Sequence, residues 1–259
     1  MITYESFFIL ILISILGPVV GVFILIFYTS HERQVYVLEM QNQQISLEKE
    51  LEISRYLQLN QQIQPHFFFN ALNSLLGLIR LKQYDRLYES FEHMAVYLRS
   101  KYTAKEPLYP LEKEVSYTES YLEIQKLRFG HRLTINWEIE KGLEQAMVIP
   151  YLLQTLVENA FKHGLEMIEE QAELLIKINS LEDGRIQMIV ADNGPGFPDE
   201  IASVPGEQKV GLQNIRRRLG LLFANEAVMT AKTAPGKQGA VVQVIWPKVT
   251  IVENGGEHL

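Results

Sequence analysis

The chain has 259 residues, a formal net charge of −7 and no cysteine. Its length allows one large domain or two small ones, and 47% hydrophobic with 21% charged residues excludes a disordered chain. The lack of cysteine excludes disulfides, thiol nucleophiles and iron–sulfur clusters. Direct nucleic-acid binding through overall charge is not expected, because phosphate contacts need a basic surface.

An uncharged apolar run extends from Phe7 to Tyr28. A helix of about 20 residues crosses the hydrocarbon core of a bilayer, so residues 1–30 are predicted to be a membrane anchor with a single span at about 7–28. A cleaved signal peptide is the competing interpretation, but Glu5 and no Lys or Arg precede the run. Arg33 behind the run favours a cytoplasmic catalytic part. The sequence thus predicts a single-pass protein of the cytoplasmic membrane that contacts the lipid bilayer.

The next segment, residues 31–61, is predicted to be one continuous signalling helix, since neither glycine nor proline interrupts it. Apolar side chains at Val37, Met40, Leu47 and Leu51 follow the spacing of a short parallel coiled coil. A single amphipathic helix packed on the next domain is the alternative.

Residues 62–104 are predicted to form two helices, the second from about Asp85 to Lys101. The helical period places His66 and Asn70 on one polar stripe, beside a wide apolar face. Two helices bury little core alone, so we expect two copies to form a four-helix bundle in a homodimer. An exposed neutral imidazole is a competent nucleophile towards phosphorus. The alternative is a merely solvated histidine on the polar stripe.

The C-terminal part, residues 105–250, is predicted to be one α/β domain, followed by a tail at 251–259. Its element order suggests helices packed on one face of a mixed sheet. The expected elements are a helix from Pro110 to Phe129, a strand at Thr134–Ile139, a helix at Pro150–Lys162, strands at Leu174–Leu181 and Arg185–Ala191, a helix at Val210–Phe223, and a hairpin of Met229–Thr233 and Ala240–Trp246.

Three patches in this domain carry chemistry. In the first, the Asn159 oxygen suits Mg²⁺, while Lys162 and His163, one turn on, suit phosphate oxygens. Its alternative is a capped helix end with a hydrogen-bonded asparagine. In the second, Asp192 follows a strand and is able to accept a hydrogen bond from the exocyclic amine of a base. The alternative there is an ordinary turn.

Glycines accompany the second and third patches. Gly194 and Gly196 allow a turn and close backbone approach. Gly211, followed by Leu212, Gln213 and Asn214, is expected just before a helix N-terminus, where amide N–H groups face an anion. A solvated helix start is the alternative there.

Together the three patches resemble the N, G1 and G2 boxes of the GHKL ATP-binding fold. The segment Gln64–Asn70 resembles the H-box of LytS/YehU-type sensor histidine kinases, and the resemblance extends over about Gln62–Pro247. It implies an α+β fold class: a transmembrane helix, a coiled coil, a dimerisation hairpin and a GHKL-type α/β sandwich. The implied function is autophosphorylation of His66 with ATP, followed by transfer to an aspartate of a response regulator, often one with a LytTR-type DNA-binding domain.

The resemblance also implies residue roles. His66 is the expected phosphoacceptor, and Asn159 the ligand of Mg²⁺. Asp192 is expected to bind the adenine amine. Other expected contacts are Lys162 and His163 to phosphates, Gly194 and Gly196 at the base of a mobile lid, and Gly211, Leu212 and Asn214 along the phosphate side. Asn70 is expected to orient His66 or a water, and Glu158 to act as a base or a supporting residue.

Two positions depart from the expected pattern. Phe67 stands where many histidine kinases carry an acidic residue after the histidine. Thr155 stands where the ATP-hydrolysing members of the fold carry a glutamate, which fits a histidine acceptor better than water. Two alternatives therefore accompany the kinase: a catalytically silent ATP-binding scaffold or heterodimer partner, and a membrane-tethered ATPase.

Overall fold

The computed structural model describes residues 16, 20, 21, 24, 25, 27–48, 51, 65–103, 106–197, 207–234 and 239–249. The chain divides into two compact units, Met1–Glu52 and Ile53–Leu259. In the first unit, residues 27–48 form an exposed helix. Most of the expected span at 7–28 lies outside the described residues, and among those described no helix combines the length and apolarity needed to cross a bilayer. The coiled coil at 31–61 stays a prediction.

The second unit begins with an antiparallel helical hairpin, α2 (Pro65–Arg80) and α3 (Tyr84–Thr103). The intervening Lys82 has a left-handed backbone, with φ of 55°. The other elements are β1 (Tyr109–Pro110), α4 (Leu111–Phe129), η1 (Gly130–Arg132), β2 (Leu133–Ile139), β3 (Met147–Val148), α5 (Leu152–His163), η2 (Leu165–Met167), β4 (Ala172–Ser180), β5 (Arg185–Asp192), α6 (Glu207–Phe223), η3 (Ala224–Glu226), β6 (Val228–Thr233) and β7 (Ala240–Pro247).

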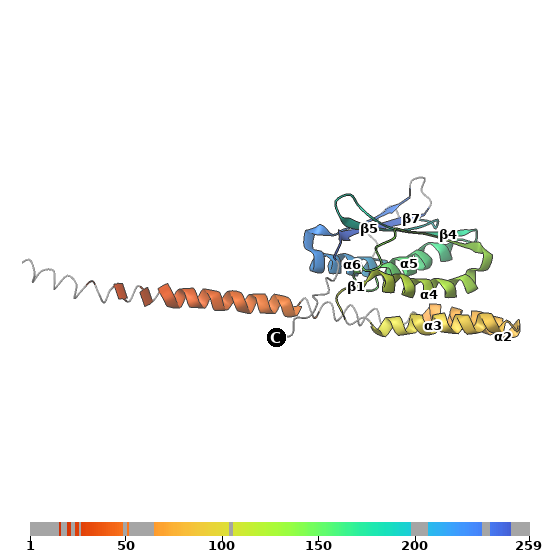
Figure 1. The fold of residues 1–259 in the computed structure, drawn as a ribbon, viewed down its shortest axis with the longest axis horizontal. Coiled ribbons are helices and arrows are strands. Elements are labelled where there is room, and N and C mark those ends of the chain that lie inside the picture. The colour runs from red at the N-terminus through yellow and green to blue at the C-terminus, as the bar shows by residue number, and fades with distance from the viewer. Residues whose placement is uncertain are drawn as a thin grey trace, which may run out of the picture. The chain divides into compact units, whose positions relative to one another are not determined.

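Five strands form one mixed sheet in the order β2-β4-β5-β7-β6. Strands β2 and β4 are parallel, and the other three pairs are antiparallel. Helices α4, α5 and α6 cover one face of this sheet, as Figure 1 shows. The prediction of helices on one face of a mixed sheet is confirmed, as are the two β-hairpins.

The core lies between the sheet and these helices, because alternate strand residues are apolar and face them. The fully buried residues of these strands, among those described, are Ala172, Leu174, Ile176 and Ile178 on β4, Ile186 and Met188 on β5, and Val244 on β7.

The α2–α3 hairpin packs against α4, on the side of that helix away from the sheet (Figure 1). Its inner side chains, Phe67, Ala71, Met94 and Tyr97, belong to the same core as the sheet. Helix α4 therefore covers the inner face within one chain, and the four-helix bundle of a homodimer stays a prediction.

An outer apolar face of the hairpin is left exposed in the single chain. It consists of Phe69, Leu72, Leu76 and Ile79 on α2, with Tyr84, Tyr88 and Phe91 on α3. Leu76 is 50% exposed and Phe69 64%. We call this set the outer face of the hairpin.

Candidate active site

His66 lies in the first turn of α2, with its side chain 72% exposed. The amide nitrogen of Asn70, one turn on, lies 3.4 Å from its Nδ1 and 3.2 Å from its Nε2. His66 and Asn70 thus lie on the same side of α2, as the helical period predicts. Among the described residues, the acidic group closest to it is Glu166 of η2, whose Oε2 lies 4.0 Å from His66 Nδ1.

Helix α5 carries the first patch near its C-terminal end. The amide nitrogen of Asn159 is buried and has no hydrogen-bond partner among the residues that the structure describes. A buried asparagine amide with unused hydrogen-bonding capacity suits a Mg²⁺ ligand, because rotation about its side chain turns the oxygen towards the ion. Lys162, which is exposed, and the half-buried His163 lie in the last turn. These residues fit the ATP–Mg²⁺ that the sequence predicts.

Gly211 lies directly beside Asn159. A Cβ built on Gly211 would lie 3.4 Å from Asn159 Nδ2 and 3.7 Å from Thr155 Cγ2. The first and third patches therefore meet across α5 and α6, with Leu212 and Asn214 half-buried just after the glycine.

The expectation that Gly211 precedes the helix is wrong, because α6 begins a turn earlier, at Glu207. Glu207, Gln208 and Lys209 all have good helix propensity. The amides without partners inside the helix are those of its first turn, so an anion site at this helix end would use the backbone of residues 207–210.

Asp192 is the last residue of β5, and its side chain lies beside the C-terminus of α5. Its Oδ1 accepts hydrogen bonds from the amides of Gly194, at 2.9 Å, and Ala240, at 3.4 Å. Burial raises the pKa of this carboxyl above its usual value, and the two amide bonds oppose the shift. A Cβ on Gly164 would lie 2.5 Å from Asp192 Oδ1, and one on Gly194 would lie 2.4 Å from Gly164 Cα. Both glycines are therefore required for this close approach.

The loop after Asp192 is held by a pair of later residues. Gly196 has φ of +78°, and a Cβ there would lie 2.7 Å from Thr233 Cγ2. The Thr233 hydroxyl accepts a hydrogen bond from the Phe197 amide at 3.1 Å. Gly239 has φ of +90°, and a Cβ there would meet the Asp192 carbonyl oxygen at 2.0 Å.

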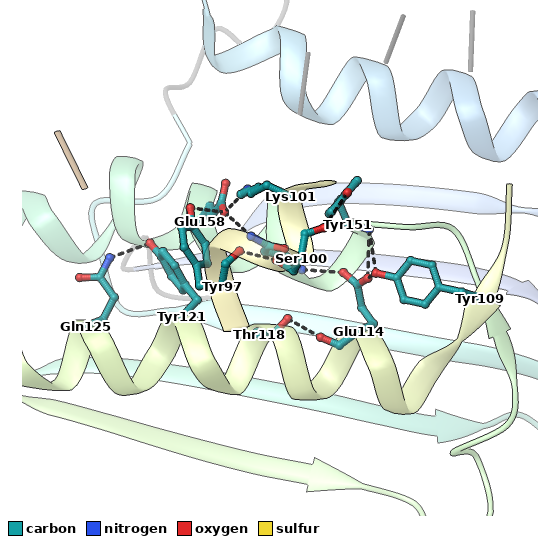
Figure 2. A network of polar contacts seen from close by, with 11 residues as sticks. Tyr97, Ser100, Lys101, Tyr109, Glu114, Thr118, Tyr121, Gln125, Tyr151 and Glu158 are labelled. Carbon is teal, nitrogen blue, oxygen red and sulfur yellow. Dashed lines mark hydrogen bonds and ion pairs between the residues drawn. The ribbon is translucent and has the colours of Figure 1, made fainter. Parts of the chain in front are cut away.

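Glu158 lies in a buried polar network between α3 and α5 (Figure 2). Its Oε1 accepts hydrogen bonds from Lys101 Nζ at 2.8 Å, Gln154 Nε2 at 2.8 Å and Tyr97 OH at 3.4 Å. The Tyr151 hydroxyl donates to the Ser100 carbonyl at 2.9 Å. Burial and Glu158 together raise the pKa of Tyr97 well above its usual value. This contact ties the hairpin to the helix that carries Asn159.

A second buried carboxylate caps α5 from outside the helix. Tyr151, at the N-cap, makes no capping side-chain bond within the described chain. Instead Glu114 of α4 accepts the amide of Tyr151 at 3.0 Å and that of Gln154 at 2.9 Å, and Tyr109 OH also donates to it (Figure 2). Burial raises the pKa of Glu114 to about 7, against the opposing effect of these amides.

The contacts of Glu166, Thr233, Gly239 and Glu114 at this site were not predicted from the sequence. Their sequence surroundings offer little to find them by, because each acts on a residue far away in the chain. Gly239, in a turn before a strand, is the one that the glycine pattern of this domain hinted at.

Two family models match the chain. The model described as histidine kinase matches residues 54–133. The model described as histidine kinase-, DNA gyrase B-, and HSP90-like ATPase matches residues 146–250. Together they cover most of the chain: the first contains the hairpin and α4, and the second contains the elements from β3 to β7.

Curated relatives agree with these models. Sensor protein LytS of Staphylococcus saprophyticus is 35% identical over 178 residues, which cover 65% of this chain and 30% of that protein. Sensor protein LytS of Bacillus subtilis is 33% identical over 66% of this chain and 30% of its own length. Sensor histidine kinase YesM of Bacillus subtilis is 30% identical over 64% and 28%. The chain thus spans about a third of the length of these relatives.

The hairpin with its exposed histidine lies in the first matched region, and the three patches lie in the second. The chain therefore contains a region of the histidine kinase family, followed by an ATP-binding domain of the kind found in DNA gyrase B and HSP90.

Proposed function

We propose that this protein is a sensor histidine kinase of a two-component system. It transfers the γ-phosphoryl group of ATP to His66 and then to an aspartate of a response regulator. One observation carries the proposal: the exposed imidazole of His66 lies 4.0 Å from Glu166, and Glu166 follows the helix end where Gly164 touches Asp192. The acceptor and the nucleotide residues thus belong to one compact unit.

The nucleotide residues have distinct tasks. Asp192 accepts the adenine amine, and the close-packed Gly194 and Gly196 shape the backbone around it. Asn159 holds Mg²⁺, which neutralises charge on the phosphates when bound. Lys162 and His163 contact phosphate oxygens, while Gly211, Leu212 and Asn214 lie along the phosphate side.

The reaction itself is an in-line displacement. Nε2 of His66 forms a bond to the γ-phosphorus as the bond to the bridging oxygen breaks, and the electron pair of that bond leaves with ADP. Positioning and charge neutralisation do most of the work in phosphoryl transfer. Asn70, beside the imidazole, holds a water for later removal of phosphate.

The wider setting is also part of the proposal. The apolar run at 7–28 anchors the protein in the cytoplasmic membrane as a single span, and residues 31–61 pass a signal to α2. The outer face of the hairpin pairs with a second copy to form a four-helix bundle. The response regulator is of the LytTR type. On fractionation, the full chain is expected in the membrane pellet, and residues 53–259 alone in the supernatant.

Autophosphorylation tests the central step. The full chain is incubated with γ-labelled ATP and Mg²⁺ beside His66→Gln, Asn159→Ala and His131→Gln, the last being a matched change at another exposed histidine. We expect acid-labile, alkali-stable label on wild type and on His131→Gln, and none on the other two. Label that persists in His66→Gln would show that another residue is the acceptor.

The silent-partner alternative makes a different forecast. A scaffold would bind ATP with wild-type His66 unlabelled under every condition, including mixtures with other histidine kinases of the same cell. The alternative of a membrane-tethered ATPase predicts that His66→Gln still releases phosphate from ATP. Thr155, which lies 3.7 Å from the Cβ position of Gly211, offers no carboxylate to activate water and so disfavours it.

A further inference from the structure

We propose that Glu166 is the positioning residue of His66: it accepts the Nδ1–H of the imidazole and so leaves the Nε2 lone pair for the γ-phosphorus. This inference rests on the proposed kinase function. Many histidine kinases carry an acidic residue directly after the histidine, whereas this chain has Phe67 there. The required carboxylate comes instead from the ATP-binding domain, one hundred residues away in the chain.

Glu166 is held in place from two directions. The preceding residue, Leu165, is fully buried and anchors η2 in the core. The guanidinium of Arg128, on α4, donates to Glu166 Oε1. The other oxygen, Oε2, is the one that lies 4.0 Å from His66 Nδ1. The carboxylate is thus only 19% exposed and faces a histidine that is 72% exposed.

Phe67 explains why the two groups meet. Its ring packs against Tyr97 at 4.8 Å and against Tyr121 at 4.9 Å between centroids. This buried contact fixes the first turn of α2 on α4. Because adjacent helix residues point about 100° apart, docking Phe67 inwards places His66 at the edge of the interface, beside η2.

Donor and acceptor chemistry separates Glu166 from Asn70. The amide nitrogen of Asn70 is only a donor. A hydrogen bond from this nitrogen to Nε2 would occupy the nucleophilic lone pair. A hydrogen bond from it to Nδ1 would select the tautomer with hydrogen on Nε2. An ionised carboxylate only accepts, so it selects the Nδ1–H tautomer that the attack requires. A contact of 4.0 Å is longer than a hydrogen bond, but catalytic hydrogen bonds are often long before substrate binds.

The proposed step balances. The Nε2–P bond forms, the γ-phosphorus to bridging-oxygen bond breaks, and its electron pair leaves on ADP. The imidazole gains positive charge, which the carboxylate of Glu166 stabilises through Nδ1–H. That proton then passes to Glu166 and on to water, leaving a neutral imidazole ring that carries the anionic phosphoryl group on Nε2.

A nitrogen-15 NMR spectrum tests the contact independently of activity. The full chain is labelled at its six histidines, and His66→Gln identifies the His66 signals. We expect the Nδ1–H tautomer in wild type, a shift towards Nε2–H in Glu166→Gln, and no shift in Glu169→Gln, an exposed control on the same loop. A wild-type His66 in the Nε2–H form would overturn the proposal, whatever the variants do.

Kinetics supplies the second measurement. Glu166→Gln is expected to lower the rate of His66 phosphorylation at saturating ATP by about 10²-fold or more, with the KM for ATP unchanged. Glu166→Asp, which keeps the carboxylate, recovers part of the rate. A Glu166→Gln chain as fast as Glu169→Gln would overturn the proposal. If wild type takes no label, the kinase assignment fails, whereas the tautomer measurement still decides the contact.

Discussion

At the scale of single residues, Glu114 shows how one carboxylate organises a helix. It lies fully buried and accepts two amides at the start of α5, where unpaired N–H groups and the positive end of the helix dipole meet. Its pKa is nevertheless raised to about 7, because loss of hydration outweighs the amide bonds. The carboxyl group that caps α5 is therefore a titratable group inside the core.

This equilibrium predicts a pH dependence of stability. The folded chain keeps the Glu114 proton up to about pH 7, whereas the unfolded chain releases it at the ordinary value of 4.5. Stability must then fall as pH rises between these values, by roughly 3 kcal/mol from this group. We expect Glu114→Gln to remove that part of the slope. Urea unfolding of residues 53–259 from pH 4.5 to 8 measures it.

The control is Glu112→Gln, an exposed position in the same first turn of α4. Its stability profile should run parallel to that of wild type. If the stability profile of Glu114→Gln is also parallel to that of wild type, Glu114 does not titrate in this pH range in the folded chain.

The Lys101–Glu158 pair gives a second prediction at this scale. Lys101 is 4% exposed and lies 2.8 Å from the carboxylate. Lys101→Met removes a buried ammonium group from beside a buried carboxylate, and such changes cost about 3–5 kcal/mol. Lys101→Met/Glu158→Met should recover much of the loss. The exposed pair Lys177–Glu138, also 2.8 Å apart, is the control, and Lys177→Met should cost less than about 1 kcal/mol. Equal losses in urea unfolding would contradict this prediction.

At the scale of elements, the ends of α5, β5 and β7 meet with almost no space between them. Gly164, Gly194 and Gly239 each lie where a Cβ would touch the backbone or side chain of a neighbouring element. The Gly239 amide also donates to the Gly194 carbonyl at 2.6 Å. Asp192 is thus positioned by contacts between the ends of separate elements.

Gly239→Ala tests whether this close packing of the element ends positions Asp192. The new methyl group would meet the Asp192 carbonyl, so the backbone that carries Asp192 must move. We expect a loss of stability and weaker ATP binding, measured by urea unfolding and titration calorimetry. Gly184→Ala is matched, since φ is +80° there and the space is open. It should cost about 1–3 kcal/mol from backbone strain alone and leave ATP affinity unchanged. A wild-type affinity for ATP in Gly239→Ala would show that the close packing of the element ends does not position Asp192.

At the scale of the whole molecule, the outer face of the hairpin gathers most of the exposed large apolar side chains in the described second unit. Its residues recur at helical spacing on α2 and α3, and surfaces of this kind mark interaction sites. The inner face is already covered by α4. A second copy of the chain would therefore add to the hairpin without disturbing the contact of Phe67 with Tyr121.

We predict that Leu76→Glu converts a dimer of residues 53–259 into a monomer, because a charge would enter the bundle interior. Analytical ultracentrifugation over a range of concentrations measures the change. Val228→Glu, at another exposed apolar residue on β6, should leave the dimer intact. If wild type is monomeric at every concentration, the outer face has another partner.

The order of the helices and strands could be predicted from the sequence, since apolar periodicity and turn residues are local signals. The hairpin around Gly184 and the strand that ends at Asp192 are examples. The start of α6 was missed by about a turn, because the expectation of an exposed glycine amide outweighed the helix propensity of Glu207 to Lys209. The spacing of the patches predicted Asn159 and Gly211 as parts of one site, and the structure places them side by side.

What the sequence by itself determined is the family resemblance, the element order and the residue types of the candidate nucleotide site, because these depend on neighbours within a few turns of chain. Only the tertiary structure decided that Glu114 caps α5, that Lys101 pairs with Glu158, and that Glu166 faces His66. Each of these contacts joins residues about forty or more positions apart. Their formation depends on how the hairpin packs on α4 and α5, which no local pattern encodes.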